Sequence, residues 1–185
     1  MSQPSQPHGL PTVEEYLRME ETATVRHEYV GGMVHAMVGA TKRHNRIVGN
    51  VYAHLLTASR GGPCRVYVET VKLRAAEDTI YYPDVMVACG PEGDDPLVEH
   101  EPCLVVEVAS SSTESIDRRE KMLAYRKIPT LRAYLIVAQD ERRVERHWRG
   151  ESGEWRQGEA VGEGGFVPVP CPETKLPLAE IYEGL

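Results

Sequence analysis

The apolar stretch Leu104-Val105-Val106-Glu107-Val108-Ala109 decides how the rest of this sequence is interpreted. Three valines and a leucine in so short a run predict a strand that is buried on both faces of a sheet. An ionised carboxylate is costly to bury unless it is paired or holds a metal ion. Glu107 therefore predicts either a structural ion pair, with Arg74 or Arg132 as the partner, or a metal-binding or catalytic role, which we favour.

The residues that follow this stretch predict a strand-helix-strand unit. The strand covers residues 104–110, a helix runs over about 115–127 until Pro129 ends it, and a further apolar strand covers 133–138. A right-handed parallel crossover is the expected connection between the two strands.

The pattern of apolar residues also predicts the other elements. A capping box between Thr12 and Glu15 begins the first helix, and the acidic, Gly- and Pro-rich residues 90–102 predict a surface loop. The expected elements are a helix from 12 to about 20, a hairpin of strands 27–30 and 33–38 around Gly31-Gly32, a helix over 42–59, strands over 65–68, 71–74 and 80–89, an exposed antiparallel pair over 143–149 and 154–160, and a final strand or short helix over 176–182. We expect a disordered tail over residues 1–11 and a single α/β domain with a mixed sheet over 12–185.

Composition limits the class of protein. A chain of 185 residues is long enough for one domain with its own core, and its apolar runs are too short to span a membrane. The N-terminus lacks the layout of a secretory signal, so a cytoplasmic location is expected by default. The four cysteines form no C-x-x-C pair, and we expect them to be scattered reduced thiols.

The formal net charge of −7 argues against tight, indiscriminate binding to nucleic acid. It does not exclude a nuclease, because metal-binding carboxylates count toward this charge and local basic clusters can guide a substrate. Taken alone, each basic cluster is better explained as a solvated surface. The clusters are Lys42-Arg43-His44-Asn45-Arg46, Arg118-Arg119 with Lys121, and Arg142-Arg143 with Arg146.

Asp84 is the second acidic candidate. It follows Pro83, which cannot donate a ladder hydrogen bond and so marks a strand start, an edge or a bulge. A turn-capping role is an equally good explanation of this aspartate by itself. If Asp84 and Glu107 lie on neighbouring strands, however, their charges repel unless a cation lies between them, which favours a divalent metal.

Three other residues are candidates for the same site. Lys121 lies four residues after Asp117 and four before Tyr125, so it is either part of an ordinary helix-surface ion pair or able to reach over the end of the Glu107 strand. Glu28 and His44 are weaker candidates, since the first could be an exposed hairpin residue and the second a hydrogen-bonded core histidine.

Taken together, these residues resemble the PD-(D/E)XK nuclease superfamily, and in particular its Uma-type restriction-endonuclease-like branch. The resemblance covers residues 12–140 and is specific only as a set. The matching residues are Pro83-Asp84-Val85, Val105-Val106-Glu107-Val108-Ala109-Ser110, Ser112-Thr113, Asp117, Lys121, Tyr125, Glu28 with Gly32, and His44. One departure is that Ala109 stands where the superfamily has its lysine, which the branch moves to the next helix, at Lys121.

This resemblance implies a restriction-endonuclease-like mixed sheet flanked by helices, and a nuclease that acts on DNA. It implies that Asp84, Glu107 and the Val108 carbonyl bind Mg²⁺ or Mn²⁺ and that Lys121 assists hydrolysis. Glu28 and His44 could border this metal centre, with His44 as a base, a phosphate donor or an outer-shell ligand. A homodimer would suit the cutting of two strands. The main alternative is a catalytically silent relative that binds nucleic acid or a protein partner. A serine hydrolase has little support, because the sequence has no G-x-S-x-G motif.

Overall fold

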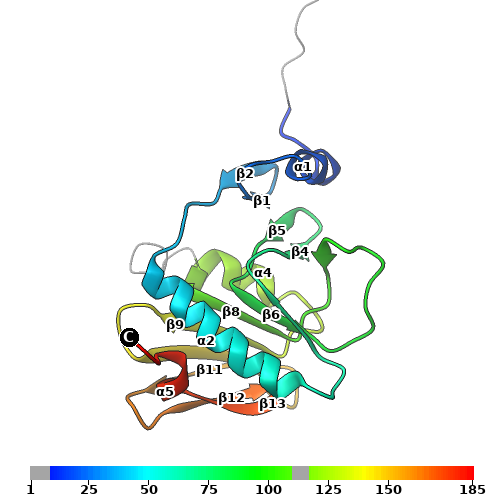
Figure 1. Ribbon diagram of the computed structural model, residues 1–185. Helices are drawn as coiled ribbons and strands as arrows, with labels where there is room; N and C mark the ends of the chain where they lie inside the picture. Colours follow the sequence, from blue (N-terminus) through cyan, green and yellow to red (C-terminus); the bar gives the residue numbers. More distant parts are fainter. Residues whose placement is uncertain (1–8, 110–116) are drawn as a thin grey trace, which may run out of the picture.

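A six-stranded mixed sheet forms the centre of the fold (Figure 1). The structure is a computed structural model and describes residues 9–109 and 117–185. In spatial order the strands are β11 (Trp155–Val161), β10 (Arg143–Arg149), β9 (Ala133–Ala138), β8 (Leu104–Ala109), β6 (Val85–Ala88) and β3 (Arg65–Val68). Because β8 pairs in parallel with β9 and antiparallel with β6, it is an interior strand, and all six of its residues are buried.

A second sheet of five strands lies beside the first. Its order is β2 (Met33–Ala36), β1 (His27–Val30), β5 (Thr79–Tyr81), β4 (Lys72–Ala76) and β7 (Val98–Glu99). The N-terminal helix α1 (Val13–Glu20) packs on the β1–β2 hairpin through a small cluster in which Tyr16 and Tyr29 are buried. Figure 1 shows α1 and this hairpin at one end of the molecule.

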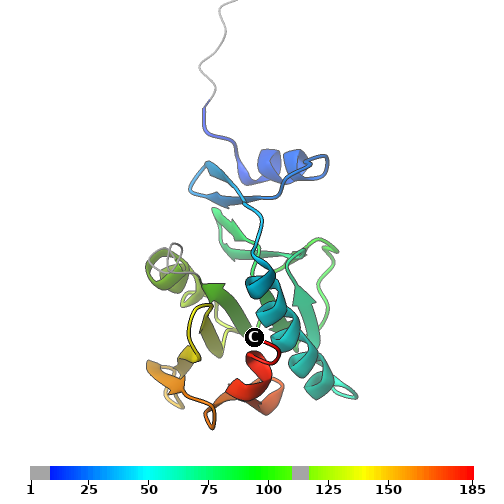
Figure 2. The same ribbon diagram turned by 60° about the vertical axis from the view of Figure 1, so that its left-hand side comes forward.

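The alternation of side chains along β8 divides the core between the two faces of the central sheet. Leu104 and Val106 point to the face covered by α2 (Lys42–Ser59), the hairpin of β12 (Phe166–Pro170) with β13 (Glu173–Pro177), and α5 (Leu178–Ile181). Val105 points to the opposite face, which α4 (Met122–Tyr125) covers. Figures 1 and 2 show α2 lying across one face of the sheet. Glu107 shares its side of β8 with Val105 and therefore faces α4.

The expected architecture is confirmed in its main features. The chain has an α/β fold with a mixed sheet, an N-terminal helix and a hairpin, and the strand-helix-strand unit does join two parallel strands. Thr12 and Glu15 form the predicted capping box, and α2 has the predicted bounds. The expected C-terminal segment contains both the end of a strand and a short helix.

Three expectations about local structure were wrong. Residues 80–89 do not form one strand but two, β5 and β6, which belong to different sheets. Pro83 lies between them, and its missing N–H prevents a continuous ladder. The loop over 90–102 contains the short strand β7, and the expected final elements omitted β12.

The helix after β8 also differs from the expected form. Its described part begins with a π-helical turn over Asp117–Lys121, and only Met122–Tyr125 is α-helical. A π-helical turn inside a helix often occurs at a functional site. The expected start near Ser115, and the Ser110, Ser112 and Thr113 of the family pattern, lie outside the described residues.

The expectation of scattered reduced thiols was also wrong. Cys64 is bonded to Cys89 and Cys103 is bonded to Cys171, which leaves no free cysteine. No local pattern indicates this pairing, because the partners are separated by 25 and 68 residues. The second bond joins the turn of the β12–β13 hairpin to the start of β8.

Candidate active site

Glu107 lies in the interior strand β8 with only 4% of its surface exposed. Lys121, at the end of the π-helical turn, reaches it with 3.1 Å between Nζ and Glu107 Oε1. The hydroxyl of Tyr125 donates to the same oxygen at 2.7 Å. Because Lys121 and Tyr125 are four residues apart on the helix that covers this face, both side chains can point toward one carboxylate.

Glu28 joins the same cluster from the N-terminal hairpin. Its Oε1 lies 3.1 Å from Lys121 Nζ, so a single ammonium group contacts one carboxylate from each of the two larger sheets. Glu28 Oε1 also accepts a long hydrogen bond of 3.4 Å from the backbone N–H of Tyr82. The aromatic ring of Tyr81 lies below the ammonium, with 5.3 Å from Nζ to the ring centre. The ammonium charge of Lys121 thus compensates the negative charges of Glu28 and Glu107, which are largely shielded from solvent.

Asp84 lies at the junction between the two sheets, between β5 and β6. Its Oδ2 accepts a hydrogen bond of 2.6 Å from the backbone N–H of Val108, the residue after Glu107. This bond fixes the Asp84 carboxylate beside the end of β8 at which Glu107 lies. Val108 therefore contacts Asp84 through its N–H, whereas the sequence-based hypothesis concerned its carbonyl.

His44 contacts the other oxygen of Asp84, with 3.1 Å between Nε2 and Oδ1. Thr41 caps α2 and also donates to the Gln139 side chain, while Arg43 donates to the Gln139 backbone carbonyl at 2.6 Å. Gln139 directly follows β9, so these bonds attach the start of α2 to the end of the central sheet. His44 is in this way held next to Asp84.

The pKa of His44 reflects opposing influences. Burial lowers this pKa. The hydrogen bond to Asp84 and the charge of this carboxylate, with smaller contributions from Glu69 and the Val108 backbone, raise the pKa by more than burial lowers it. The net result is a pKa above the ordinary value, because the negative charges around the ring stabilise the imidazolium form. Burial, and then the charge of Glu107, raise the pKa of Tyr125 well above its usual range, so this hydroxyl remains a hydrogen-bond donor.

Glu69 is a residue that sequence reasoning missed. One ligand atom from each of His44, Glu69 and Asp84 lies within 4.8 Å of the others, a spacing that suits a metal ion. Glu69 follows β3 with a φ of +53°, which is uncommon for a residue with a side chain, and its backbone N–H donates to the Asp84 carbonyl. The available signal was its position, since it is an acidic residue directly after the strand over residues 65–68.

The candidate residues therefore form two adjoining groups in the described part of the chain. Lys121 brings together Glu28 and Glu107, whereas Asp84 lies with His44 and Glu69. The Val108 N–H connects the groups through Asp84. The side chain of Asp117 lies outside the described residues.

Replacing Tyr125 by Phe tests how much the group of Glu28, Glu107 and Lys121 depends for its stability on the buried Tyr125 hydroxyl. We expect Tyr125→Phe to lower the free energy of unfolding by about 1.5–3 kcal/mol, the usual contribution of a hydrogen bond to a charged group. Chemical denaturation measures this change. Tyr52→Phe is the control, because Tyr52 is half-buried and its hydroxyl has no hydrogen-bond partner among the described residues. Equal stability of the two variants would contradict the assigned role of Tyr125.

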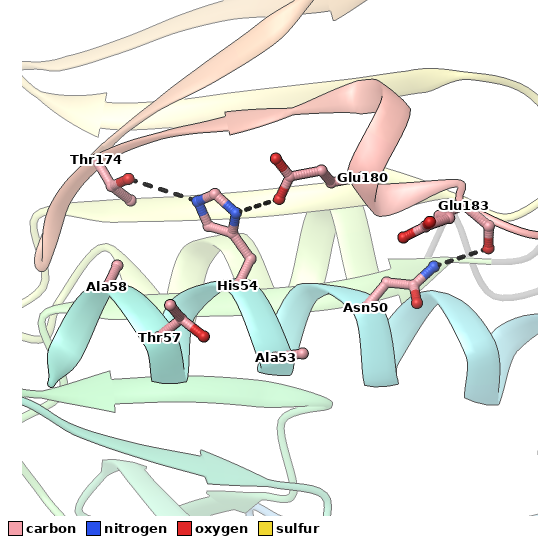
Figure 3. Close-up of a pocket in the computed structure, with 8 residues that line it drawn as sticks. All are labelled: Asn50, Ala53, His54, Thr57, Ala58, Thr174, Glu180 and Glu183. Carbon is pink, nitrogen blue, oxygen red and sulfur yellow. Dashed lines mark hydrogen bonds and ion pairs between the residues drawn. The ribbon is translucent and has the colours of Figure 1, made fainter.

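A surface pocket between α2 and the C-terminal elements is separate from this site. Figure 3 shows His54 between Glu180 and Thr174, with 2.6 Å from Nδ1 to Glu180 Oε2 and 3.4 Å from Nε2 to the Thr174 hydroxyl. His54 lies ten residues after His44, which is about 15 Å along the axis of α2. None of the acidic candidate residues lines the pocket.

Comparisons with known proteins found a matching family, two relatives and a solved structure of similar fold. The family described as "Uma2: Putative restriction endonuclease" matches residues 13–179. Two uncharacterized proteins of Synechocystis sp., slr1290 and sll1609, are each 34% identical to the chain over 82% of its length, which is 81% and 88% of their own. A crystal structure from Anabaena variabilis, described as a putative nuclease of the DUF820 group, superposes with a TM-score of 0.75 at 16% identity and covers 93% of this chain and 97% of that one. This structural likeness shows a common fold.

Proposed function

This chain belongs to the Uma2 family, and from that premise we propose that it is a metal-dependent endonuclease that hydrolyses phosphodiester bonds of DNA. The observation that supports the proposal most strongly is the gathering of acidic groups from four distant segments around one end of the central sheet. Glu28, Glu69, Asp84 and Glu107 come from a hairpin, a turn, a sheet junction and a buried strand. A purely structural ion pair does not need so many carboxylates.

The donor atoms suit a small divalent cation. Carboxylate and carbonyl oxygens are the ligands that Mg²⁺ and Mn²⁺ prefer, and imidazole is also accepted by transition metals. Asp84 and Glu107 would hold the metal, with the Val108 carbonyl as the backbone ligand that the family resemblance implies. Glu69 offers a further oxygen and His44 a nitrogen beside Asp84. A bound ion would supply an activated water and would neutralise charge on the phosphate.

The side chains around this centre have complementary roles in the proposed reaction. Lys121 carries a positive charge next to Glu107, where it can stabilise the negative charge that develops on the phosphate or orient the attacking water. Tyr125 holds the Glu107 carboxylate in place through the hydrogen bond that its hydroxyl donates. His44, at the start of α2, holds the Asp84 carboxylate in place beside the proposed metal centre.

The start of α2 is a suitable surface for the DNA backbone. Lys42 and Arg46 are exposed on either side of His44, and the N-terminus of a helix attracts anions. The basic cluster at Arg142 and Arg143 is less suitable, because these side chains already pair with Glu163, Glu141 and Glu159. The proposal includes a homodimer, in which two such sites would cut the two strands.

A metal-dependent cleavage assay tests the proposed function. Wild-type protein should cleave plasmid DNA with Mn²⁺ or Mg²⁺ and lose that activity with a chelator. Asp84→Asn should raise the metal concentration needed for half-maximal cleavage by at least about 10–100-fold, the cost of losing even an outer partner of a metal ligand, since Asn keeps one oxygen but loses the charge. Asp94→Asn, on an exposed loop, is the matched control. Metal-independent cleavage, or an Asp84→Asn variant with unchanged metal dependence, would refute the proposal, and inactivity under all conditions would favour the silent relative.

A further inference from the structure

The four cysteines gather at the other end of the central sheet from the acidic site. Cys89 follows β6 and Cys103 precedes β8, whereas Asp84 and Val108 lie near the opposite ends of these strands. Cys64 comes from the segment before β3, and Cys171 comes from the turn of the β12–β13 hairpin. The sulfur atoms of Cys89, Cys103 and Cys171 therefore lie together, and Cys64 is attached to this group through its bond to Cys89.

The sulfurs form one continuous cluster rather than two separate pairs. Cys64 is bonded to Cys89 and Cys103 to Cys171, but the Sγ atoms of Cys89 and Cys103 are also in contact at 3.3 Å. The Sγ atoms of Cys89, Cys103 and Cys171 all lie within 4.8 Å of one another. Two disulfides that serve only as independent cross-links do not require this contact.

We propose that this cluster is a four-thiolate site for a soft divalent cation, Zn²⁺, when its cysteines are reduced. In reduction, each disulfide takes two electrons and two protons from a dithiol, which is itself oxidised to a disulfide. Zinc then binds the four sulfurs as the thiols release their protons to solvent. The metal would replace the disulfides as the cross-link between the C-terminal hairpin and the central sheet.

This exchange requires movement of the cysteine side chains, and the largest movement is at Cys64. Zinc–sulfur bonds of about 2.3 Å in a tetrahedral site place the sulfurs about 3.8 Å apart. The Cys89–Cys103 contact is already close to that spacing. The two sulfurs of each bonded pair must separate, and Cys64, which is not among the three sulfurs that lie within 4.8 Å of one another, must turn further than the others; rotation of the side chains can supply these movements. Cys103 and Cys171 are buried and Cys64 and Cys89 are half-buried, so the site is closed yet reached from the Cys64–Cys89 side.

Cobalt titration of the reduced full-length protein tests this inference. The protein is reduced with dithiothreitol, freed of metal with a chelator, transferred to metal-free buffer without reductant under inert gas, and titrated with Co²⁺. We expect thiolate-to-cobalt charge-transfer bands and the visible bands of tetrahedral cobalt, saturating at one equivalent and displaced by one equivalent of zinc. Absence of these bands, or cysteines that remain as two disulfides after dithiothreitol treatment, would overturn the inference.

Variants separate the sulfur cluster from the acidic site. Asp84→Asn should keep the cobalt bands unchanged, because carboxylate ligands give no thiolate charge transfer. Cys64→Ser and Cys103→Ser should each lose the one-equivalent saturation and give altered or absent bands, and wild-type spectra from either variant would overturn a four-sulfur site. If circular dichroism shows that Cys103→Ser does not fold, the wild-type titration and the half-buried Cys64→Ser still decide the question.

Discussion

The free energy of unfolding of the Lys121→Met variant is expected to be about 3–5 kcal/mol lower than that of the wild type, the usual cost of removing one partner from a buried ion pair. Its ammonium lies 3.1 Å from both Glu28 and Glu107, and its side chain is only 9% exposed. Methionine has a similar length but leaves these two carboxylates facing each other without the cation. Desolvation and mutual repulsion then act together against the folded state.

Denaturant unfolding of matched variants measures this effect. Lys127→Met is the control, because Lys127 is exposed at the end of the same helical segment and should change stability by no more than about 0.5 kcal/mol. The double variant Lys121→Met with Glu107→Gln should recover part of the loss, since it removes one of the two carboxylate charges that the Lys121 ammonium compensates. If Lys121→Met is as stable as Lys127→Met, the ammonium does not compensate the two carboxylates as described.

Glu107→Gln should reduce DNA cleavage about 10²–10³-fold, the range found when one group that stabilises a transition state is removed. Glutamine fits the same space in β8 and can still accept hydrogen bonds from Lys121 and Tyr125. It cannot supply the negative charge that the proposed metal centre needs. The loss should therefore appear in the rate of cleavage while the fold is retained.

Initial cleavage rates at saturating Mn²⁺, with circular dichroism of each protein, separate these effects. Glu173→Gln provides the matched control, because Glu173 is exposed on the C-terminal hairpin. A folded Glu107→Gln protein that cleaves at the wild-type rate would remove Glu107 from the proposed mechanism. That outcome would leave Glu107 as a structural partner of Lys121.

Strong local patterns were sufficient to predict much of the fold. The capping box at Thr12, the apolar stripe of α2 and the buried run of β8 each correspond to an element with nearly the expected bounds. The costly burial of Glu107 also indicated correctly that this carboxylate has partners, and those in the structure include Lys121 and Tyr125. Whether the candidate residues are catalytic stays a prediction.

Other features depend on tertiary contacts that no local pattern encodes. Pro83 indicated an irregular strand, but not that the chain changes sheets there. Glu69 reaches Asp84 through a turn with positive φ, and nothing in the sequence marks an ordinary glutamate for that conformation. The cysteine pairs come from segments 25 and 68 residues apart, so their meeting follows only from the completed sheet and hairpin.

An anomalous difference map from a crystal soaked in Mn²⁺ tests the proposed metal centre most directly. We expect a peak within coordination distance, about 2.2 Å, of an Asp84 carboxylate oxygen, with at least one further ligand from Glu107, the Val108 carbonyl, Glu69 or His44. The same soak of Asp84→Asn crystals should weaken or abolish the peak. If the side chains of the wild-type site are well ordered but hold no manganese, or if manganese binds only elsewhere on the molecule, Asp84 and Glu107 do not form the proposed metal centre.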